Sequence, residues 1–233
     1  VSKYLAALSS AIMILTFIAI AGSSPSMIRA GIVSGLGILA WYYGRKFHPI
    51  VLLSLAIALT LIIDPSYAWG DLGWQLSFAA FAGVMILAPL ATKYFFGDKK
   101  PNFVGQLLIE TVAAQIMTAP IIIFAFGQFS NVAVLTNLLV LPFVPIAMLL
   151  VFIAGIGAVL LPLAAANYFA APATWLLKYM TGVIDYFAGF DWSMVSLSPK
   201  WYLLPICYAL IIGLCLYFWR ATKYNLWDSN LVE

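Results

Sequence analysis

The chain has 233 residues, 65% of them hydrophobic and 8% charged, and its formal net charge is +3. Soluble domains carry roughly 25% charged residues, so this composition excludes an ordinary soluble globule. The apolar residues form continuous runs, unlike the short alternating segments of a membrane β-barrel. We therefore expect an all-α, polytopic transmembrane helix bundle that crosses a bilayer about seven or eight times.

Seven apolar runs predict helices, which cover residues 5–21, 26–43, 49–63, 75–92, 104–126, 131–161 and 201–220. The run 131–161 is too long for one ordinary span and contains Pro142 and Pro145, while Pro120 lies inside 104–126. Proline removes a backbone hydrogen bond within a helix. The sequence therefore predicts proline-broken helices at membrane depth.

The segment 172–188 has a polar stripe. Thr174, Lys178, Thr181 and Asp185 follow one another at spacings of four, three and four residues, which puts them on one face of an amphipathic helix. Pro172 suits the first position of that helix. Two interpretations remain open: the helix lies along the membrane surface, or its polar stripe faces an aqueous cavity.

Aromatic and basic residues mark the ends of the runs. An interfacial belt is predicted at Trp41 to Tyr43, Trp69, Trp74, Tyr94 to Phe96, Trp201, Tyr202 and Tyr217 to Trp219. Basic residues gather at Lys3, Arg45, Lys46, Lys93, Lys99 and Lys100, so these segments are predicted to be cytoplasmic. The side on which the C-terminus lies depends on whether the helix 172–188 spans the bilayer.

The residue types needed for enzyme chemistry are scarce. The chain has one histidine, His48, and no HxxxD, HxH or CxxC grouping, so the sequence predicts no metal site and no cofactor. An intramembrane serine protease would need a base beside its serine. Ser34 in Gly31–Gly35 has only His48 outside the helix, and we expect that the chain is not an enzyme.

Polar residues inside the apolar runs are the candidate functional groups. Thr111, Gln115 and Thr118 share one helix face, with Glu110 beside them, and Asn137 precedes Pro142. The ionisable residues in predicted spans are Arg29, Glu110, Lys178 and Asp185. The alternative for Gln115 and Asn137 is hydrogen bonding that holds the bundle together, and for Arg29 it is a side chain that extends to the membrane surface.

Motifs in a fixed order indicate a family. They are Ser26–Ala30, Gly44-Arg45, Asp64-Pro65, Asp71–Phe78, Gln115–Pro120, Phe126–Ser130 and Thr136–Pro142. This ordered set, between residues 26 and 142, resembles the competence domain of the ComEC/Rec2 family of bacterial DNA-uptake channels. The remaining residues are similar to that family only in hydropathy.

The resemblance implies a multi-pass protein of the bacterial cytoplasmic membrane that passes single-stranded DNA during natural transformation, without sequence preference. Full-length relatives carry a soluble N-terminal domain, and many carry a metallo-β-lactamase-like C-terminal domain. This chain has no histidine-rich metal motif. Residues 1–233 are therefore expected to be a single channel domain from a longer polypeptide. Partners would include a DNA receptor and a separate cytosolic motor, because the chain has no GxxxxGK[ST] loop; homo-oligomerisation stays open.

A wet, mostly uncharged lining would let a polyanion slide without sticking. We assign that lining to Gln75, Ser77, Gln115, Thr118 and Asn137, and the wider set of channel-lining candidates adds Arg29, Glu110, Thr111, Lys178 and Asp185. The alternative function is a secondary transporter of a small solute, since broken helices suit a binding site at mid-membrane. Against it, the two halves of the chain show no internal repeat. An intramembrane enzyme or a structural scaffold is the third possibility.

Overall fold

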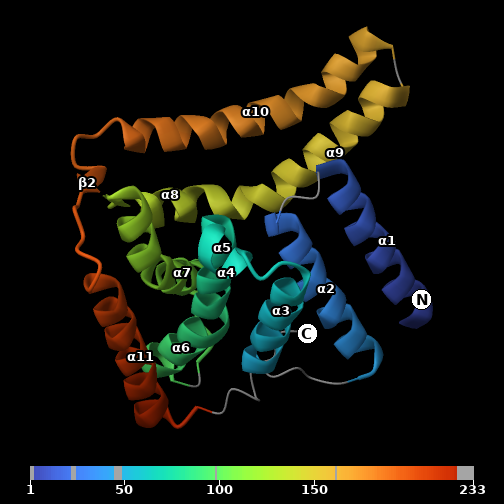
Figure 1. Ribbon diagram of the computed structural model, residues 1–233. Coiled ribbons are helices and arrows are strands. Elements are labelled where there is room, and N and C mark those ends of the chain that lie inside the picture. The colour runs from blue at the N-terminus through green and yellow to red at the C-terminus, as the bar shows by residue number, and fades with distance from the viewer. Residues whose placement is uncertain (1–2, 22–24, 45–48, 98, 161, 225–233) are drawn as a thin grey trace.

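The structure is a computed structural model that describes residues 3–21, 25–44, 49–97, 99–160 and 162–224 (Figure 1). Its helices are α1 (Lys3–Ala21), α2 (Pro25–Tyr42), α3 (Pro49–Ile63), α4 (Tyr67–Gly70), α5 (Leu72–Ala82), the π-helical segment η1 (Gly83–Leu87), α6 (Ala88–Phe96), α7 (Phe103–Phe126), α8 (Ala133–Val140), the 3-10 turn η2 (Leu141–Phe143), α9 (Val144–Leu160), α10 (Leu163–Ala188) and α11 (Leu203–Thr222). Two short strands, β1 (Gln128–Ser130) and β2 (Met194–Ser196), complete the described part. The expected all-α class is confirmed.

Within the part of the chain that the structure describes, four helices are long and apolar enough to cross a membrane: Leu72–Phe96, Phe103–Phe126, Ala133–Val159 and Leu203–Thr222. Three shorter apolar helices, α1, α2 and α3, precede them in the chain. Large hydrophobic side chains remain exposed along many helices, such as Ile62 at 78% and Val159 at 84% exposure. Apolar side chains are stable in such positions when the surrounding medium is itself apolar, as in a bilayer.

The helices form two groups that meet at α5. Figure 1 shows α1, α2 and α3 side by side in blue, and α6, α7 and α11 on the other side of α5. The α9–α10 pair runs across one end of both groups, with α9 packed along α10. One buried cluster, Ala56, Trp74 and Phe78, joins α3 to α5; the other, with Leu87, Leu90, Ala113 and Phe218, joins η1, α6, α7 and α11.

Side chains and glycine mark the helix ends. Asp71 is the N-cap of α5 and accepts a hydrogen bond from the Trp74 N–H at 2.8 Å, while Asn102 caps α7 through the Gly105 N–H at 2.9 Å. Each cap satisfies a backbone donor that has no partner within the first turn. Gly127 ends α7 with a φ of +66°, the left-handed conformation that glycine adopts most readily.

The helix from Leu72 to Phe96 touches the α7 backbone at Gly83, the first residue of η1. A Cβ atom added there would lie 2.6 Å from the Ala113 carbonyl oxygen and 2.9 Å from Ala114 Cα. Glycine is therefore required for this approach, and it lets the two helices pack more closely than side chains would permit. A single π turn of this kind is often found at functional sites.

The two strands tie the end of α7 to the segment after α10. They pair antiparallel, with Gln128 opposite Ser196, Phe129 opposite Val195 and Ser130 opposite Met194. The Leu197 N–H also donates to the Gly127 carbonyl at 2.7 Å. The motif Phe126–Ser130 thus forms a turn and a strand that fix two connections far apart in the sequence.

Gly127→Ala is expected to lower the free energy of unfolding by about 1 kcal/mol, because an alanine is strained in the left-handed conformation. Its Cβ would also lie 3.1 Å from the Leu197 carbonyl oxygen. The melting temperature of the detergent-purified protein measures the effect. Gly44→Ala is the matched control, since Gly44 has a φ of +63° and open space around it. If the two variants melt at the same temperature, the contact with Leu197 contributes nothing to the destabilisation of Gly127→Ala.

Several predicted helix boundaries are corrected by the structure. Pro172 was expected at a helix start, but it lies inside α10, which begins at Leu163. The preceding stretch is rich in alanine, the strongest helix former, which favours this earlier start. The helix predicted over 75–92 begins earlier, at Leu72, because Asp71 caps it. The α7 helix continues through Pro120, whereas Pro142 and Pro145 lie in η2 and the first turn of α9.

Candidate functional site

Arg29 is the charged residue buried most deeply among the described residues, at 3% exposure. It projects from α2 toward the start of α5, where its Nη2 donates to the Gly73 carbonyl at 2.7 Å. Its guanidinium also lies over the Phe78 ring, 5.9 Å from the ring centre, within the range of a cation–π interaction. Arg29 therefore lies inside the α2–α5 contact, close to the first turn of α5.

The residues around Arg29 are tied together by hydrogen bonds. Trp74 Nε1 donates to the Thr60 hydroxyl at 2.9 Å, and Thr60 is 1% exposed. The Asp71 carboxylate, which caps α5, attracts the Arg29 charge. We call the set Arg29, Thr60, Asp71, Gly73, Trp74 and Phe78 the Arg29 cluster. It joins α2, α3 and α5, and so brings together the motifs around residues 29 and 71–78.

The sequence identified Arg29 but missed most of its neighbours. Trp74 was assigned to the interfacial belt, yet its ring is 9% exposed and packs 4.8 Å from the Phe78 ring. The reason is that Asp71 caps the helix three residues earlier, which places Trp74 in the first turn of α5 facing α3. Thr60 lies in a helix whose other residues are apolar except Ser54, and its pairing with Trp74 has no local signal in the sequence.

The connection before α5 holds two more polar residues in place. Gln75 Nε2 donates to the Ala68 carbonyl in α4 at 2.9 Å. The Ser66 side chain and backbone N–H donate to Asp64, with Ser66 N 2.9 Å from Asp64 Oδ1, and these bonds lower the pKa of the Asp64 carboxyl. The carboxylate thus fixes the Asp64-Pro65-Ser66 turn that leads from α3 into α4.

A second polar group lies on α7, and we call Glu110, Thr111, Gln115 and Thr118 the α7 polar face. Gln115 Nε2 donates to the Ser130 carbonyl of β1 at 3.3 Å. Thr118 bonds back to the Ala114 carbonyl at 2.9 Å, Glu110 accepts from Gln106, and Thr111 is 5% exposed. Both predicted glutamines, Gln75 and Gln115, therefore hold a connecting segment against a helix.

The sequence analysis did not identify Tyr208, which contacts the backbone of α7. The Tyr208 hydroxyl of α11 donates to the Met117 carbonyl at 3.1 Å. Met117 lies three residues before Pro120, which lacks the N–H of an ordinary helix residue. The tyrosine thus supplies a hydrogen bond from another helix near the position where the proline removes one.

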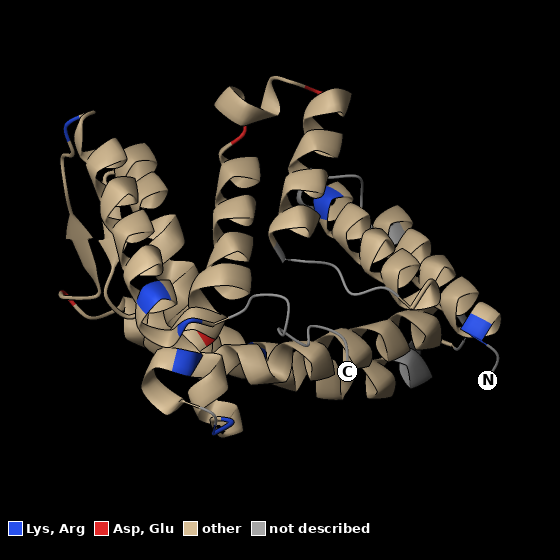
Figure 2. Cartoon of the chain, turned by 90° about the horizontal axis from the view of Figure 1, so that it is seen from below, with Lys and Arg blue, Asp and Glu red and all other residues tan. Residues whose placement is uncertain are grey.

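The other predicted residues are not gathered into the same place. Asn137 is exposed on α8, Lys178 and Asp185 are exposed on α10, and Ser77 is half-buried on α5. Charged residues are few along the whole chain, as Figure 2 shows in blue and red. Five of the ten candidates therefore lie in two polar groups, with Arg29 in one and Glu110, Thr111, Gln115 and Thr118 in the other, and α5 connects these groups by packing along α7.

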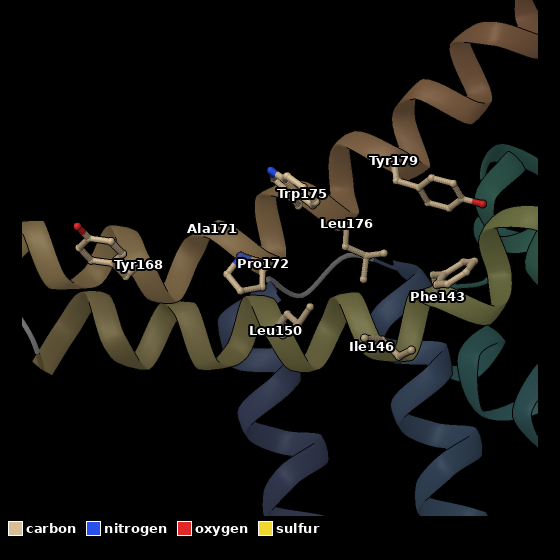
Figure 3. Close-up of a pocket in the computed structure, with 9 residues that line it drawn as sticks. All are labelled: Phe143, Ile146, Leu150, Tyr168, Ala171, Pro172, Trp175, Leu176 and Tyr179. Atoms are coloured by element: carbon tan, nitrogen blue, oxygen red, sulfur yellow. The ribbon is translucent and has the colours of Figure 1, made fainter.

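An apolar groove between α9 and α10 is lined by none of the predicted channel-lining residues. It is an open groove of about 690 Å³ between α9 and α10, lined by Phe143, Ile146, Leu150, Tyr168, Ala171, Pro172, Trp175, Leu176 and Tyr179 (Figure 3). A smaller groove of about 400 Å³ between α1 and α2 includes Ser34. Among the described residues, no three His, Cys, Asp or Glu side chains are grouped as a metal site requires.

Comparisons with known proteins agree with the motif pattern. The family model described as Competence protein matches residues 1–222. The chain is also similar to ComE operon protein 3 of Bacillus subtilis (strain 168), with 26% identity over 175 residues, 72% of this chain and 21% of the relative. The chain thus spans about a fifth of that relative's length. No solved structure shows significant similarity to it. Because the family model covers nearly every residue, the chain belongs to the competence protein family.

Proposed function

We propose that this chain is the membrane-embedded part of a channel that passes single-stranded DNA across the bacterial cytoplasmic membrane during natural transformation. The observation that carries the proposal is the competence-family match over residues 1–222, in a chain with four helices able to cross a membrane. The similarity to ComE operon protein 3 supports the same function. The resemblance of the motifs to the ComEC/Rec2 family agrees with both.

In this proposal seven or eight segments cross the bilayer. Besides the four long helices, α1, α2 and α3 cross the bilayer, and they contain 19, 18 and 15 residues. At 1.5 Å per residue they are about 20 to 30 Å long, close to the thickness of the hydrocarbon core. The amphipathic helix α10 would be the eighth crossing, or it would lie along the surface with its exposed Lys178 and Asp185 in water.

The channel needs a polar path through an apolar medium. Gln115 and Thr118 of the α7 polar face and the exposed Asn137 supply uncharged hydrogen-bonding groups, and a lining of this kind hydrates a polyanion without holding it in one place. In the proposal the chain carries out no chemical step and hydrolyses no nucleotide. A DNA receptor outside and a cytosolic motor inside complete the transport.

Uptake of end-labelled duplex DNA by cells lacking the intact gene tests the proposal. The assay separates surface-bound label from nuclease-resistant label inside the cell. Surface label without internal label, reversed by the restored gene, places the protein at the membrane-crossing step. Unchanged internal label in a strain whose parent takes up DNA contradicts the channel and favours transport of a small solute.

Asn137→Leu and Gln115→Leu are each expected to reduce internal label about tenfold or more, because an apolar side chain dehydrates the path of the polyanion. Gln115→Leu also removes the bond to Ser130, so Asn137, exposed on α8, isolates the effect of the lining. Asn167→Leu makes the same change at an exposed position of α10 and is the control. Normal uptake by Asn137→Leu at a normal protein level would remove Asn137 from the lining.

A further inference from the structure

The C-terminal ends of α6 and α11 form an aromatic cluster that the proposed lining does not include. The Tyr94 ring stacks on the Phe218 ring, with centres 4.7 Å apart and an angle of 29° between the planes. The Tyr94 and Tyr217 hydroxyls lie 3.4 Å apart, and the Phe95 ring packs 6.1 Å from Phe218. The two helix ends lie side by side although Tyr94 and Tyr217 are 123 residues apart in the chain (Figure 1).

This cluster is anchored on one side and open on the other. Phe218 is 8% exposed and belongs to the buried cluster of η1, α6 and α7. Phe95 and Tyr217 are 67% and 57% exposed. Rings held by neighbours lose little conformational freedom when a flat ligand stacks on them, so an anchored and open cluster suits stacking.

Basic residues lie next to the same cluster in the sequence. Lys93 lies in the last turn of α6 and Arg220 in the last turn of α11. Lys99, Lys100 and Lys223 follow these turns, whereas Asp98 is the single acidic residue in the segments 93–100 and 217–224. Five basic residues and one acidic residue give this end more positive charge than the net +3 of the whole chain.

Helix dipoles account for only part of this charge. A helix C-terminus carries roughly half a negative charge, so two adjacent ends attract about one positive charge between them. The five basic residues exceed this charge and the single acidic residue together, so this end is positive overall. Basic segments favour the cytoplasmic side of membrane proteins, so the excess of Lys and Arg predicts that this end faces the cytoplasm.

We propose that this basic–aromatic end, formed by Lys93, Tyr94, Phe95, Tyr217, Phe218 and Arg220, binds single-stranded nucleic acid as it leaves the membrane. The cations contact the phosphodiester groups and the exposed rings stack on the bases, the combination by which proteins bind single strands without sequence preference. The inference rests on the proposed function and adds a binding site at the exit. Anionic lipid headgroups carry the same phosphodiester charge and are the competing ligand in the test.

The test measures binding of an oligothymidylate strand to the full-length protein in zwitterionic nanodiscs at several salt concentrations. Phe95→Ala is expected to weaken binding about tenfold, because one stacked base is lost. Lys93→Gln combined with Arg220→Gln is expected to reduce the slope of log affinity against log salt by about 0.7 per residue. Lys200→Gln is the matched control, since Lys200 lies 6.0 Å from the Tyr202 ring away from this cluster, and binding should be unchanged.

Photocrosslinking gives a second readout that does not depend on variant folding. Iodouracil placed in the strand is expected to crosslink to the peptides that contain Tyr94 or Tyr217. Crosslinks confined to other peptides, or variants that bind the strand as the wild type does, overturn the inference. Variants that lose affinity only for anionic nanodiscs would assign the end to lipid and also overturn it.

Uptake assays separate failure of this inference from failure of the proposed function. If the gene is required for internal label while the Phe95 and Lys93–Arg220 variants bind the strand and take up DNA normally, the exit site is wrong and the channel stands. If cells lacking the gene take up DNA normally, the channel itself is wrong.

Discussion

Gly83→Ala is expected to destabilise the protein by about 3 kcal/mol, the upper end of the range for overpacking a buried position. The added methyl group would lie 2.6 Å from the Ala113 carbonyl oxygen and 2.9 Å from two further backbone atoms of α7. A flexible side chain in contact with the new methyl group could move aside, but all three of these atoms belong to the α7 backbone. The helices must therefore separate, and the cluster around Leu87 and Ala113 loses its packing.

The melting temperature of the purified protein and its yield in membranes measure this effect. Gly213→Ala in α11 is the control, because no atom lies within 4 Å of the position of its added Cβ. Alanine favours a helix over glycine by up to about 1 kcal/mol, so the control should melt at the same temperature or higher. A Gly83→Ala protein as stable as the wild type would show that η1 and α7 do not approach as closely as the structure has them.

Arg29→Met is expected to lower the free energy of unfolding by about 2 kcal/mol, the amount typical of a lost hydrogen bond to a charged group. Methionine retains the apolar stem but leaves the Gly73 carbonyl without its 2.7 Å bond and Asp71 without the nearby positive charge. Arg29→Lys should restore only part of the stability, because an ammonium group cannot reproduce the planar contact with Phe78.

Stability and DNA uptake, measured on the same variants, distinguish the two roles of Arg29. Lys178→Met removes an exposed cation from α10 and is the control for stability. A lower melting temperature for Arg29→Met than for Lys178→Met supports a role in joining α2 to α5. An unchanged melting temperature with a loss of uptake would instead favour the channel-lining role predicted from the sequence.

Local features of the sequence predicted most of the helices but not their exact bounds or the strands β1 and β2. Runs of apolar residues predicted most of the helices, since a helix satisfies its backbone hydrogen bonds within one segment. The errors in the predicted helices occurred where neighbouring residues favour different local structures. At Pro172 the alanine-rich stretch before it continues the helix, and at 83–87 a π turn replaces regular helix where Gly83 packs against α7.

The candidate site was predicted only in part, for a similar reason. Polarity within an apolar run identified Arg29, Gln75 and Gln115, but not what each one contacts. Gln75 and Gln115 donate to backbone carbonyls of α4 and β1, and backbone acceptors have no sequence signature. Tyr208 was missed because its partner is the Met117 carbonyl, 91 residues away.

The sequence by itself determined the class of the protein and its family. Composition requires an apolar medium around the chain, and the ordered motifs persist whatever the helices contact. The tertiary structure alone decided which motifs meet: Arg29 with Gly73, β1 with β2, and the end of α6 with the end of α11. Composition determines which solvent, water or lipid, can surround the chain as a whole. The pairings instead depend on how helices that are distant in the chain pack against one another, and single residues do not encode that packing.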